Sequence, residues 1–293
     1  MMTSYIAGVD IGGTSVKFGV LEEGHNLVYK TSAPSVLNNP DAMVDLIAKM
    51  VAECPYKIDK MGVGTPGTVL LPQNLVSAAN LGWRSAPLCA MLNRKLKIPI
   101  WVDNDAQTQL AAEWWDGACK GLQSAVYLAF GTGVGGAFLF NGKPWRGHMN
   151  TAGELGHFII HADGLPCTCG MKGCYEAYAS AGALCRMAGK DNAKDIIDAA
   201  RSGDEEMMAV FRAYLHEVAI GIASIYMLFC PEAIVLGGGI SAAGDILLHT
   251  LNEQLEIVAP GKAETIGNLL CLAVHRNDAG IRGAAALAAT FLN

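Results

Sequence analysis

One pattern occurs twice in this chain: a short apolar run, a glycine-rich loop, and a second run of mainly apolar residues. The first copy spans Ile6–Val20 around the loop Asp10–Thr14, and the second spans Val126–Phe140 around Gly131–Gly136. Runs of this length and composition predict strands, and the glycines between them predict tight hairpin loops. The repeat therefore predicts a chain built from two copies of one strand–loop–strand unit.

Helical and strand-like patterns alternate after each copy, which predicts a mostly parallel sheet with helices on its faces in each half. We expect an N-terminal α/β lobe over residues 1–118 and a C-terminal lobe over 119–293, with the final helix, about 280–293, packing on the first lobe. The expected helices are Ala42–Glu53, Ala86–Lys97, Ala106–Trp115, Ala193–Arg201, Asp204–Phe229, Ala242–Val258 and Gly280–Phe291. The further strands are Met61–Gly64, Ile100–Val102, Ala233–Leu236 and Leu270–Val274.

Composition excludes several classes of partner. With 52% hydrophobic and 16% charged residues among 293, the chain can form large cores. A net charge of −6 disfavours nucleic acid, whose binding depends on basic side chains. The N-terminus lacks the pattern of a secretory signal, and Val218–Cys230 is shorter than the roughly 20 residues that span a bilayer, so we expect a buried helix there. A cytoplasmic protein without membrane partners is predicted.

Three of the nine cysteines cluster at Cys167, Cys169 and Cys174. Nine is an odd number, and the cytosol keeps thiols reduced, so a disulfide framework is disfavoured. His157 lies upstream, with His161 as a competing fourth donor. Three cysteines and one histidine are typical of a closed, structural zinc site, and a simple turn is the alternative.

The glycine loops are candidates for phosphate binding. Gly131–Gly136 fits G-x-G-x-x-G, but in a dinucleotide-binding fold that loop opens a helix, and here Ala137–Phe140 reads as a strand. Exposed backbone N–H groups and a threonine hydroxyl in each loop can bind phosphate oxygens. A third run, Gly237–Gly239, follows a strand and allows close approach of a ligand. Singly, each loop could be an ordinary turn; the duplication favours a shared function.

Polar residues gather at the predicted end of one strand and in one later segment. Asp103–Asp105 precedes a helix, and Glu154, His157 and Glu176 follow further along. One such residue would suffice to cap the helix, so the cluster suggests more than a cap. Carboxylates, an amide and an imidazole can bind a polyhydroxylated ligand and accept a proton from it.

In these motifs the sequence resembles the ROK family of bacterial sugar kinases and repressors over nearly its whole length. The resemblance implies a two-lobed, duplicated α/β fold of the actin/hexokinase/Hsp70-like (ribonuclease H-like) type with a central cleft. The motifs that carry it are Asp10–Lys17, Gly64–Gly67, Asn80–Trp83, Asn104–Ala106, Gly131–Gly136, Glu154–His157, Cys167–Cys174 and Gly237–Ile240.

Residue roles follow from the resemblance by position. It implies an ATP-dependent hexose kinase in which Asp105 is the catalytic base. It assigns sugar binding to Gly64, Asn80, Asn104, Asp105, Glu154, His157 and Glu176. It assigns the nucleotide, with Asp10 near Mg²⁺, to Asp10, Gly12, Gly13, Thr14, Lys17, Gly131, Thr132, Gly133, Gly238 and Gly239. It assigns a structural Zn²⁺ to His157, Cys167, Cys169 and Cys174.

The acceptor sugar and the rival functions stay open. Glucose is the first choice by resemblance alone, and N-acetylmannosamine, N-acetylglucosamine, allose and fructose remain alternatives. A sugar-responsive repressor would need an added DNA-binding segment, for which the loop beginning at Asp10 leaves no room. A sugar-binding protein without activity is disfavoured because Asp105 and both loops are present. A homodimer is expected.

Overall fold

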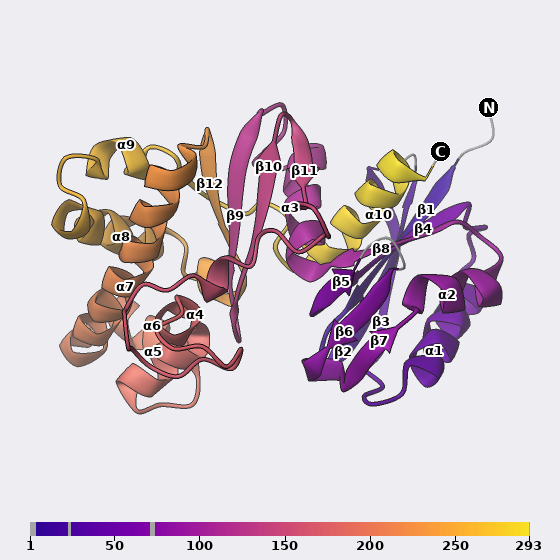
Figure 1. The fold of residues 1–293 in the computed structure, drawn as a ribbon, viewed down its shortest axis with the longest axis horizontal. Helices are drawn as coiled ribbons and strands as arrows, with labels where there is room; N and C mark the ends of the chain where they lie inside the picture. Colours follow the sequence, from indigo (N-terminus) through magenta and orange to yellow (C-terminus); the bar gives the residue numbers. More distant parts are fainter. Residues whose placement is uncertain (1–3, 23–24, 71–73, 293) are drawn as a thin grey trace. The chain divides into compact units, whose positions relative to one another are not determined.

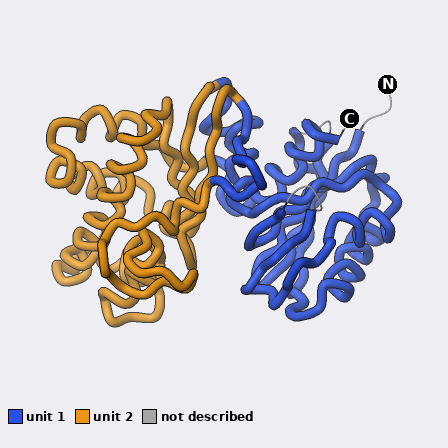
Figure 2. The backbone as a smooth tube through the Cα atoms, in the orientation of Figure 1, with its two compact units in different colours: residues 1–121, 143–152, 274–293 blue, residues 122–142, 153–273 orange. Residues whose placement is uncertain are grey.

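The chain divides into two units, which are coloured separately in Figure 2. The computed structural model describes residues 4–22, 25–70 and 74–292. Unit 1 comprises residues 1–121, 143–152 and 274–293, and unit 2 comprises 122–142 and 153–273. The chain therefore passes between the units four times, and the C-terminal segment belongs to unit 1.

Both five-stranded sheets have the same order of strands (Figure 1). The first, ordered β3-β2-β1-β4-β8, consists of β1 (Tyr5–Ile11), β2 (Ser15–Glu22), β3 (Asn26–Pro34), β4 (Lys60–Thr65) and β8 (Ile100–Asn104). The second, ordered β11-β10-β9-β12-β13, consists of β9 (Ser124–Phe130), β10 (Val134–Phe140), β11 (Lys143–Trp145), β12 (Ala233–Gly237) and β13 (Leu270–Leu272). In each, an antiparallel hairpin precedes two parallel strands. The predicted duplicated α/β fold is confirmed.

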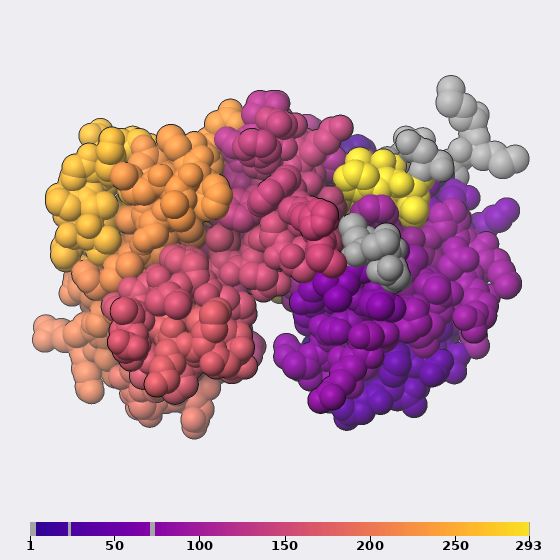
Figure 3. Space-filling model, in the orientation of Figure 1, coloured from indigo at the N-terminus to yellow at the C-terminus, as the bar shows by residue number. Residues whose placement is uncertain are grey.

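Glycines let the last helix of unit 1 lie directly on the sheet. A Cβ atom at Gly8 of β1 would lie 1.9 Å from the carbonyl oxygen of Ile281, and one at Gly62 of β4 would lie 1.8 Å from that of Ala284. Both carbonyls belong to α10, whose final turn is visible in yellow in Figure 3. The helices of unit 1 are α1 (Pro40–Glu53), α2 (Leu88–Leu96), α3 (Asp105–Asp116) and α10 (Ala279–Phe291), with 3₁₀ turns η1 (Ala79–Leu81) and η4 (Arg276–Asp278). The short strands β5 (Thr68–Leu70), β6 (Leu75–Ala78) and β7 (Trp83–Ala86) form a third sheet, too short for the sequence pattern to predict.

Unit 2 has its core between its sheet and a long helix, α7 (Glu205–Phe229). By length and composition alone α7 could cross a membrane, and half of its most apolar window is buried inside the protein. The expectation of a buried helix over 218–230 is wrong for its end, because Tyr226 is the last buried residue and Leu228 is 73% exposed. The other helices are α4 (Glu176–Ala179), α5 (Ala181–Ala188), α6 (Ala193–Arg201), α8 (Asp245–Val258) and α9 (Ala263–Gly267), with η2 (Leu155–His157) and η3 (Gly239–Ala243).

Candidate functional site

The first glycine loop closes the β1–β2 hairpin of unit 1. The Gly12 N–H donates to the Ser15 carbonyl at 2.9 Å, and the Ser35 hydroxyl donates to the Gly12 carbonyl at 2.5 Å. Across the hairpin, Asp10 and Lys17 are paired residues and their side chains form an ion pair at 3.2 Å. A Cβ at Gly13 would meet nothing within 4 Å, so the tip, which continues into Thr14, faces open space.

The second loop closes the β9–β10 hairpin of unit 2. The Gly131 N–H donates to the Gly133 carbonyl at 2.9 Å, and Thr132 at the tip is exposed. Glu176, at the start of α4, accepts from the Val134 N–H at 2.9 Å. A Cβ at Gly133 would lie 2.3 Å from Glu176 Oε2, whereas one at Gly131 would meet nothing within 4 Å. The glycine at 133 therefore makes room for the carboxylate of Glu176.

The third glycine run lies against the same hairpin. Gly238 has φ +78°, a conformation that favours glycine, and a Cβ there would lie 2.4 Å from the Phe130 carbonyl oxygen. Phe130 is the last residue of β9 and directly precedes Gly131. A Cβ at Gly239 would meet nothing within 4 Å. The structure thus brings two of the glycine motifs together at the carboxyl ends of the neighbouring strands β9 and β12.

The Asp103–Asp105 cluster of unit 1 divides into three different environments. Asp103 is fully buried at the end of β8. Asn104 caps α3, since its Oδ1 accepts from the N–H groups of Ala106 and Gln107, and its Nδ2 donates to the Gly67 carbonyl at 2.8 Å. Asp105 is the first residue of α3 and is half-buried. Of the two carboxylates, Asp105 is the one that a ligand can reach.

Two further residues expected at the sugar site lie in unit 1. Gly64, in β4, pairs with Asp103 of β8, and a Cβ at Gly64 would lie 2.7 Å from the Thr108 hydroxyl. Asn80 lies in η1 with an exposed side chain. The absence of a side chain at Gly64 therefore allows β4 to approach the start of α3.

Glu154, His157 and Glu176 lie in unit 2, and the last two act on the pKa of Glu154. Although the side chain of Glu154 reaches solvent, partial desolvation raises its pKa; His157 counteracts this and Glu176 adds to it. Glu176 also accepts from the Thr168 hydroxyl at 3.2 Å. Glu176 thus contacts both the glycine loop and the cysteine-rich loop.

The cysteine-rich loop places four donor atoms together, all within 4.8 Å of one another, from His157, Cys167, Cys169 and Cys174. The Cys167 Sγ and His157 Nδ1 are 3.6 Å apart, as are the Cys169 and Cys174 sulfurs. Tetrahedral zinc with ordinary bond lengths separates its ligands by about 3.5–3.8 Å. The donor set therefore fits a structural zinc. His161 instead pairs with Glu217 at 2.7 Å.

The protonation state of the thiols in the cysteine-rich loop depends on whether a metal ion is bound. Burial raises the pKa of the Cys174 thiol to about 12, and backbone hydrogen bonding to Met171 lowers the pKa of Cys169. A thiol with the pKa of Cys174 is deprotonated at neutral pH only when it ligates a metal. Metal binding at this loop should therefore release protons.

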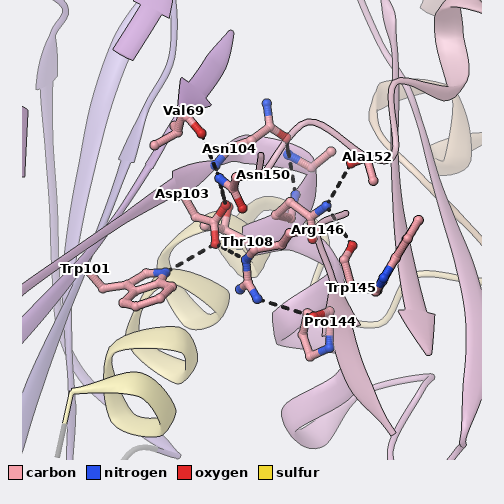
Figure 4. A network of polar contacts seen from close by, with 12 residues as sticks. Val69, Trp101, Asp103, Asn104, Thr108, Pro144, Trp145, Arg146, Asn150 and Ala152 are labelled. Carbon is pink, nitrogen blue, oxygen red and sulfur yellow. Dashed lines mark hydrogen bonds and ion pairs between the residues drawn. The ribbon is translucent and has the colours of Figure 1, made fainter. Parts of the chain in front are cut away.

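Sequence reasoning missed the buried partners of Asp103. Arg146 and Asn150 both contact it in the network drawn in Figure 4. Arg146 is 43 positions away along the chain, and nothing in its local sequence marks it as anything but a surface cation. The one weak signal of burial is the pair Pro144–Trp145, which directly precedes Arg146.

Comparison with known proteins agrees with this geometry. The ROK family model matches residues 6–290. A glucokinase from Halalkalibacterium halodurans is 33% identical, covering 97% of this chain and 94% of that protein. An N-acetyl-D-glucosamine kinase from Escherichia coli is 31% identical, covering 96% and 98%. The crystal structure of a ROK family glucokinase from Streptomyces griseus in complex with glucose and AMPPNP superposes with a TM-score of 0.85 at 30% identity, covering 98% and 100%.

The duplicated sheets, each with a glycine hairpin, define a protein of the actin/hexokinase-like fold. Within that fold, this chain belongs to the ROK family.

Proposed function

We propose that this protein is an ATP-dependent hexose kinase whose first acceptor is glucose. The observation that carries the proposal is the match, over 98% of the chain, to a glucokinase that binds glucose and AMPPNP. The two glycine hairpins and the reachable carboxylate of Asp105 supply the groups that this reaction needs. The expected ADP and sugar phosphate are directly measurable.

Asp105 is proposed as the base. Phosphoryl transfer passes through a loose transition state, so the base mainly orients the attacking hydroxyl and accepts its proton late. The position of Asp105 at the first residue of α3 fixes its backbone, and the Asn104 cap holds that helix start in place. Hydrogen bonds to the sugar hydroxyls are assigned to Asn80, Asn104, Glu154, His157 and Glu176, together with close backbone approach at Gly64.

The glycine loops are proposed to bind the nucleotide. Backbone N–H groups at Gly13 and Gly133, with the Thr14 and Thr132 hydroxyls, would hold phosphate oxygens, and Gly238 and Gly239 would lie near the adenosine. The N–H groups of Gly12 and Gly131 close the two hairpins, so these glycines would act by letting the phosphates approach the backbone. Lys17 adds a positive charge beside the first loop. Asp10 is a carboxylate of the kind that binds Mg²⁺, which supplies charge neutralisation to the phosphates when bound.

The four donors at the cysteine-rich loop are proposed to hold a structural Zn²⁺, which when bound fixes the loop's conformation. His157 faces Cys167 through Nδ1, which leaves Nε2 as the nitrogen that would bond a sugar hydroxyl. The thiolates would thereby orient a sugar-binding imidazole.

A coupled assay of ADP formation tests the proposed function. Purified protein with ATP and Mg²⁺ is tested with glucose, N-acetylglucosamine, N-acetylmannosamine, allose and fructose. We expect the highest kcat/KM with glucose. A preference for N-acetylglucosamine would support the second candidate, which the 31% identical E. coli kinase favours. No sugar-dependent ADP formation with any of these would remove the kinase assignment, and specific binding to DNA would then favour a repressor.

A cytoplasmic location and a homodimer belong to the same proposal. No disulfide joins any of the nine cysteines, all of which lie among the described residues, and this suits a reducing compartment. Unit 2 exposes three consecutive large apolar residues at the end of α7, Met227, Leu228 and Phe229. Exposed apolar surface of this kind is typical of association sites, and a second copy of the chain is the occupant we propose.

A further inference from the structure

Asp103, in unit 1, accepts four hydrogen bonds. Its Oδ2 accepts from Arg146 Nε at 2.7 Å and from Trp101 Nε1 at 3.2 Å, and its Oδ1 accepts from the Asn104 N–H at 3.0 Å and Asn150 Nδ2 at 3.3 Å. Figure 4 shows these four donors around the buried carboxylate. Each oxygen of Asp103 already accepts two hydrogen bonds and is buried, so neither is available to a ligand hydroxyl.

Arg146 is held by hydrogen bonds at Nε and Nη1 and by two aromatic rings, while its buried Nη2 has no hydrogen-bond partner among the described residues. Its guanidinium lies over the rings of Trp101 and Phe291, 5.6 and 4.9 Å from their centroids, and Nη1 donates to the Pro144 carbonyl. Only 13% of the Arg146 side chain is exposed, against 1% for Asp103. Because cation–π contacts and a charge-assisted hydrogen bond act together here, the pair has one well-defined geometry.

The segment Lys143–Ala152, which carries Arg146, contacts the rest of unit 1 at two more points. Asn150 Nδ2 also donates to the Val69 carbonyl at 3.0 Å. Gln107, in the first turn of α3, directs its Nε2 toward the carbonyls of Trp145 and Ala152 at 3.5 and 3.3 Å. Both Nδ2 and Nε2 face only carbonyl or carboxylate oxygens in these bonds, which fixes the orientation of each amide.

These contacts act on the residues assigned to the chemistry. One bond of Asp103 goes to the backbone N–H of Asn104, the residue that precedes Asp105. The segment that carries Arg146 continues in the chain directly into Gly153 and Glu154. The Asp103–Arg146 pair therefore fixes both the backbone before the base and the segment that leads to a proposed sugar contact.

We propose that Asp103 and Arg146 are positioning residues for phosphoryl transfer, which set the placement of Asp105 without touching substrate. The inference rests on the proposed kinase function. Its physical basis is that a displacement of about 1 Å in a reacting group can lower turnover by roughly 10²-fold. A buried ion pair is weak evidence for stability as such, since hydrophobic replacement of both partners is often neutral, so a positioning role explains why the pair is present here.

The test separates positioning from stability. Arg146→Met leaves the buried Asp103 charge unpaired and should lower Tm, while Asp103→Asn combined with Arg146→Met removes both charges and should recover much of that loss. We expect both variants to show kcat at least 10-fold below wild type, with ATP KM within about twofold. Arg146→Lys keeps the charge but not the planar stacking group. It should fold, with a kcat between those of wild type and Arg146→Met.

Controls and contrary outcomes are distinct. Arg94→Met removes an exposed guanidinium from α2 and should leave both kcat and Tm unchanged. A double variant whose kcat returns together with Tm, or folded variants with wild-type kcat, would overturn the positioning role while leaving the kinase assignment intact. If Arg146→Met does not fold, the Lys variant and the double variant give the same decision. A wild-type protein without sugar-dependent ATP turnover would instead remove the proposed function, and the positioning role with it.

Discussion

Asp103 and Asp105 are two residues apart and have opposite environments. The first is buried under four hydrogen-bond donors, and the second begins α3 at a half-buried position. Sequence alone shows two equivalent acids in this motif. Burial and bonding distinguish Asp105, which a ligand can reach, from Asp103, which bonds the backbone.

Asp105→Asn should lower kcat by roughly 10²-fold or more while leaving both KM values within a few-fold, because the amide keeps the shape but cannot accept the proton. Steady-state kinetics on purified protein measures this. Asp195→Asn, on the exposed first turn of α6, is the matched control. Near-normal turnover of Asp105→Asn would remove that residue from the role of base.

Gly131→Ala should raise the ATP KM several-fold and leave the hexose KM unchanged, because its Cβ has open space in the free protein but would face the phosphates. Gly133→Ala should raise the KM for both ATP and the hexose, because its Cβ would displace Glu176. Gly261→Ala, whose Cβ also meets nothing within 4 Å, is the control. An ATP KM unchanged in Gly131→Ala would contradict phosphate binding at this loop.

At the scale of elements, the cysteine-rich loop connects to the rest of unit 2 through backbone and side-chain hydrogen bonds. The Gly173 carbonyl accepts from the N–H groups of Ile160 and His161 at 2.9 and 3.3 Å. Thr168 bonds Glu176, which in turn bonds the glycine loop at Val134. Leu165 donates its N–H to the Tyr178 hydroxyl at 2.7 Å. A bound metal would add to these bonds by joining three points of the loop, Cys167, Cys169 and Cys174, to His157.

Cys169→Ser should release zinc, lower Tm and raise the hexose KM more than the ATP KM, because His157 would lose its orientation. Metal analysis of wild type should give about one zinc per chain. Cys230→Ser, at an exposed position after α7, should change none of these. Zinc-free wild-type protein with ordinary hexose KM would mean that the cysteines form only a turn.

Glu232 joins the start of β9 to the segment before β12. Its Oε2 accepts from the N–H groups of Gln123 and Ser124, both at 2.7 Å, and these bonds lower the pKa of Glu232 from the ordinary value of 4.5. A group whose pKa is lower in the folded state stabilises the protein above its unfolded pKa, and the contribution is lost as pH falls through the folded pKa.

Wild type should therefore melt at a higher temperature than Glu232→Gln at pH 7. This difference should shrink as pH drops below about 4.5, where the carboxylate of the unfolded chain begins to gain a proton, and should be lost as pH falls through the lower pKa of the folded protein. Thermal melts of both proteins from pH 7 to pH 3 measure the difference. A difference that is constant across this range would mean that the charge of Glu232 has no part in these bonds.

At the scale of the whole molecule, each unit contributes half of the proposed machinery. Unit 1 carries Asp105 and the loop at Gly13, and unit 2 carries Glu154, His157 and the loop at Gly131. The two sheets have the same strand order, which places each glycine hairpin at the equivalent position of its own unit. The duplication therefore supplies, from one structural plan, the two loops that are proposed to bind phosphate.

The proposed homodimer should appear in light scattering as a species of twice the chain mass. Leu228→Asp places a charge at a residue that is 73% exposed, so it should leave Tm of the monomer nearly unchanged and shift the population toward one chain mass. Leu37→Asp, at an exposed apolar residue of unit 1, serves as control. A wild-type protein that is monomeric at all concentrations would disprove the homodimer.

The amino-acid sequence by itself determined the duplicated α/β fold, most helices and strands to within a few residues, and the candidate residues of the site. These features follow from local patterns: apolar periodicity, glycine at loops, and the spacing of Cys167, Cys169 and Cys174. Only the tertiary structure decided that His161 pairs with Glu217, that Glu176 fills the space left by Gly133, and that Arg146 neutralises Asp103. Such pairings join residues far apart in the chain, and they depend on burial and packing that no local pattern encodes.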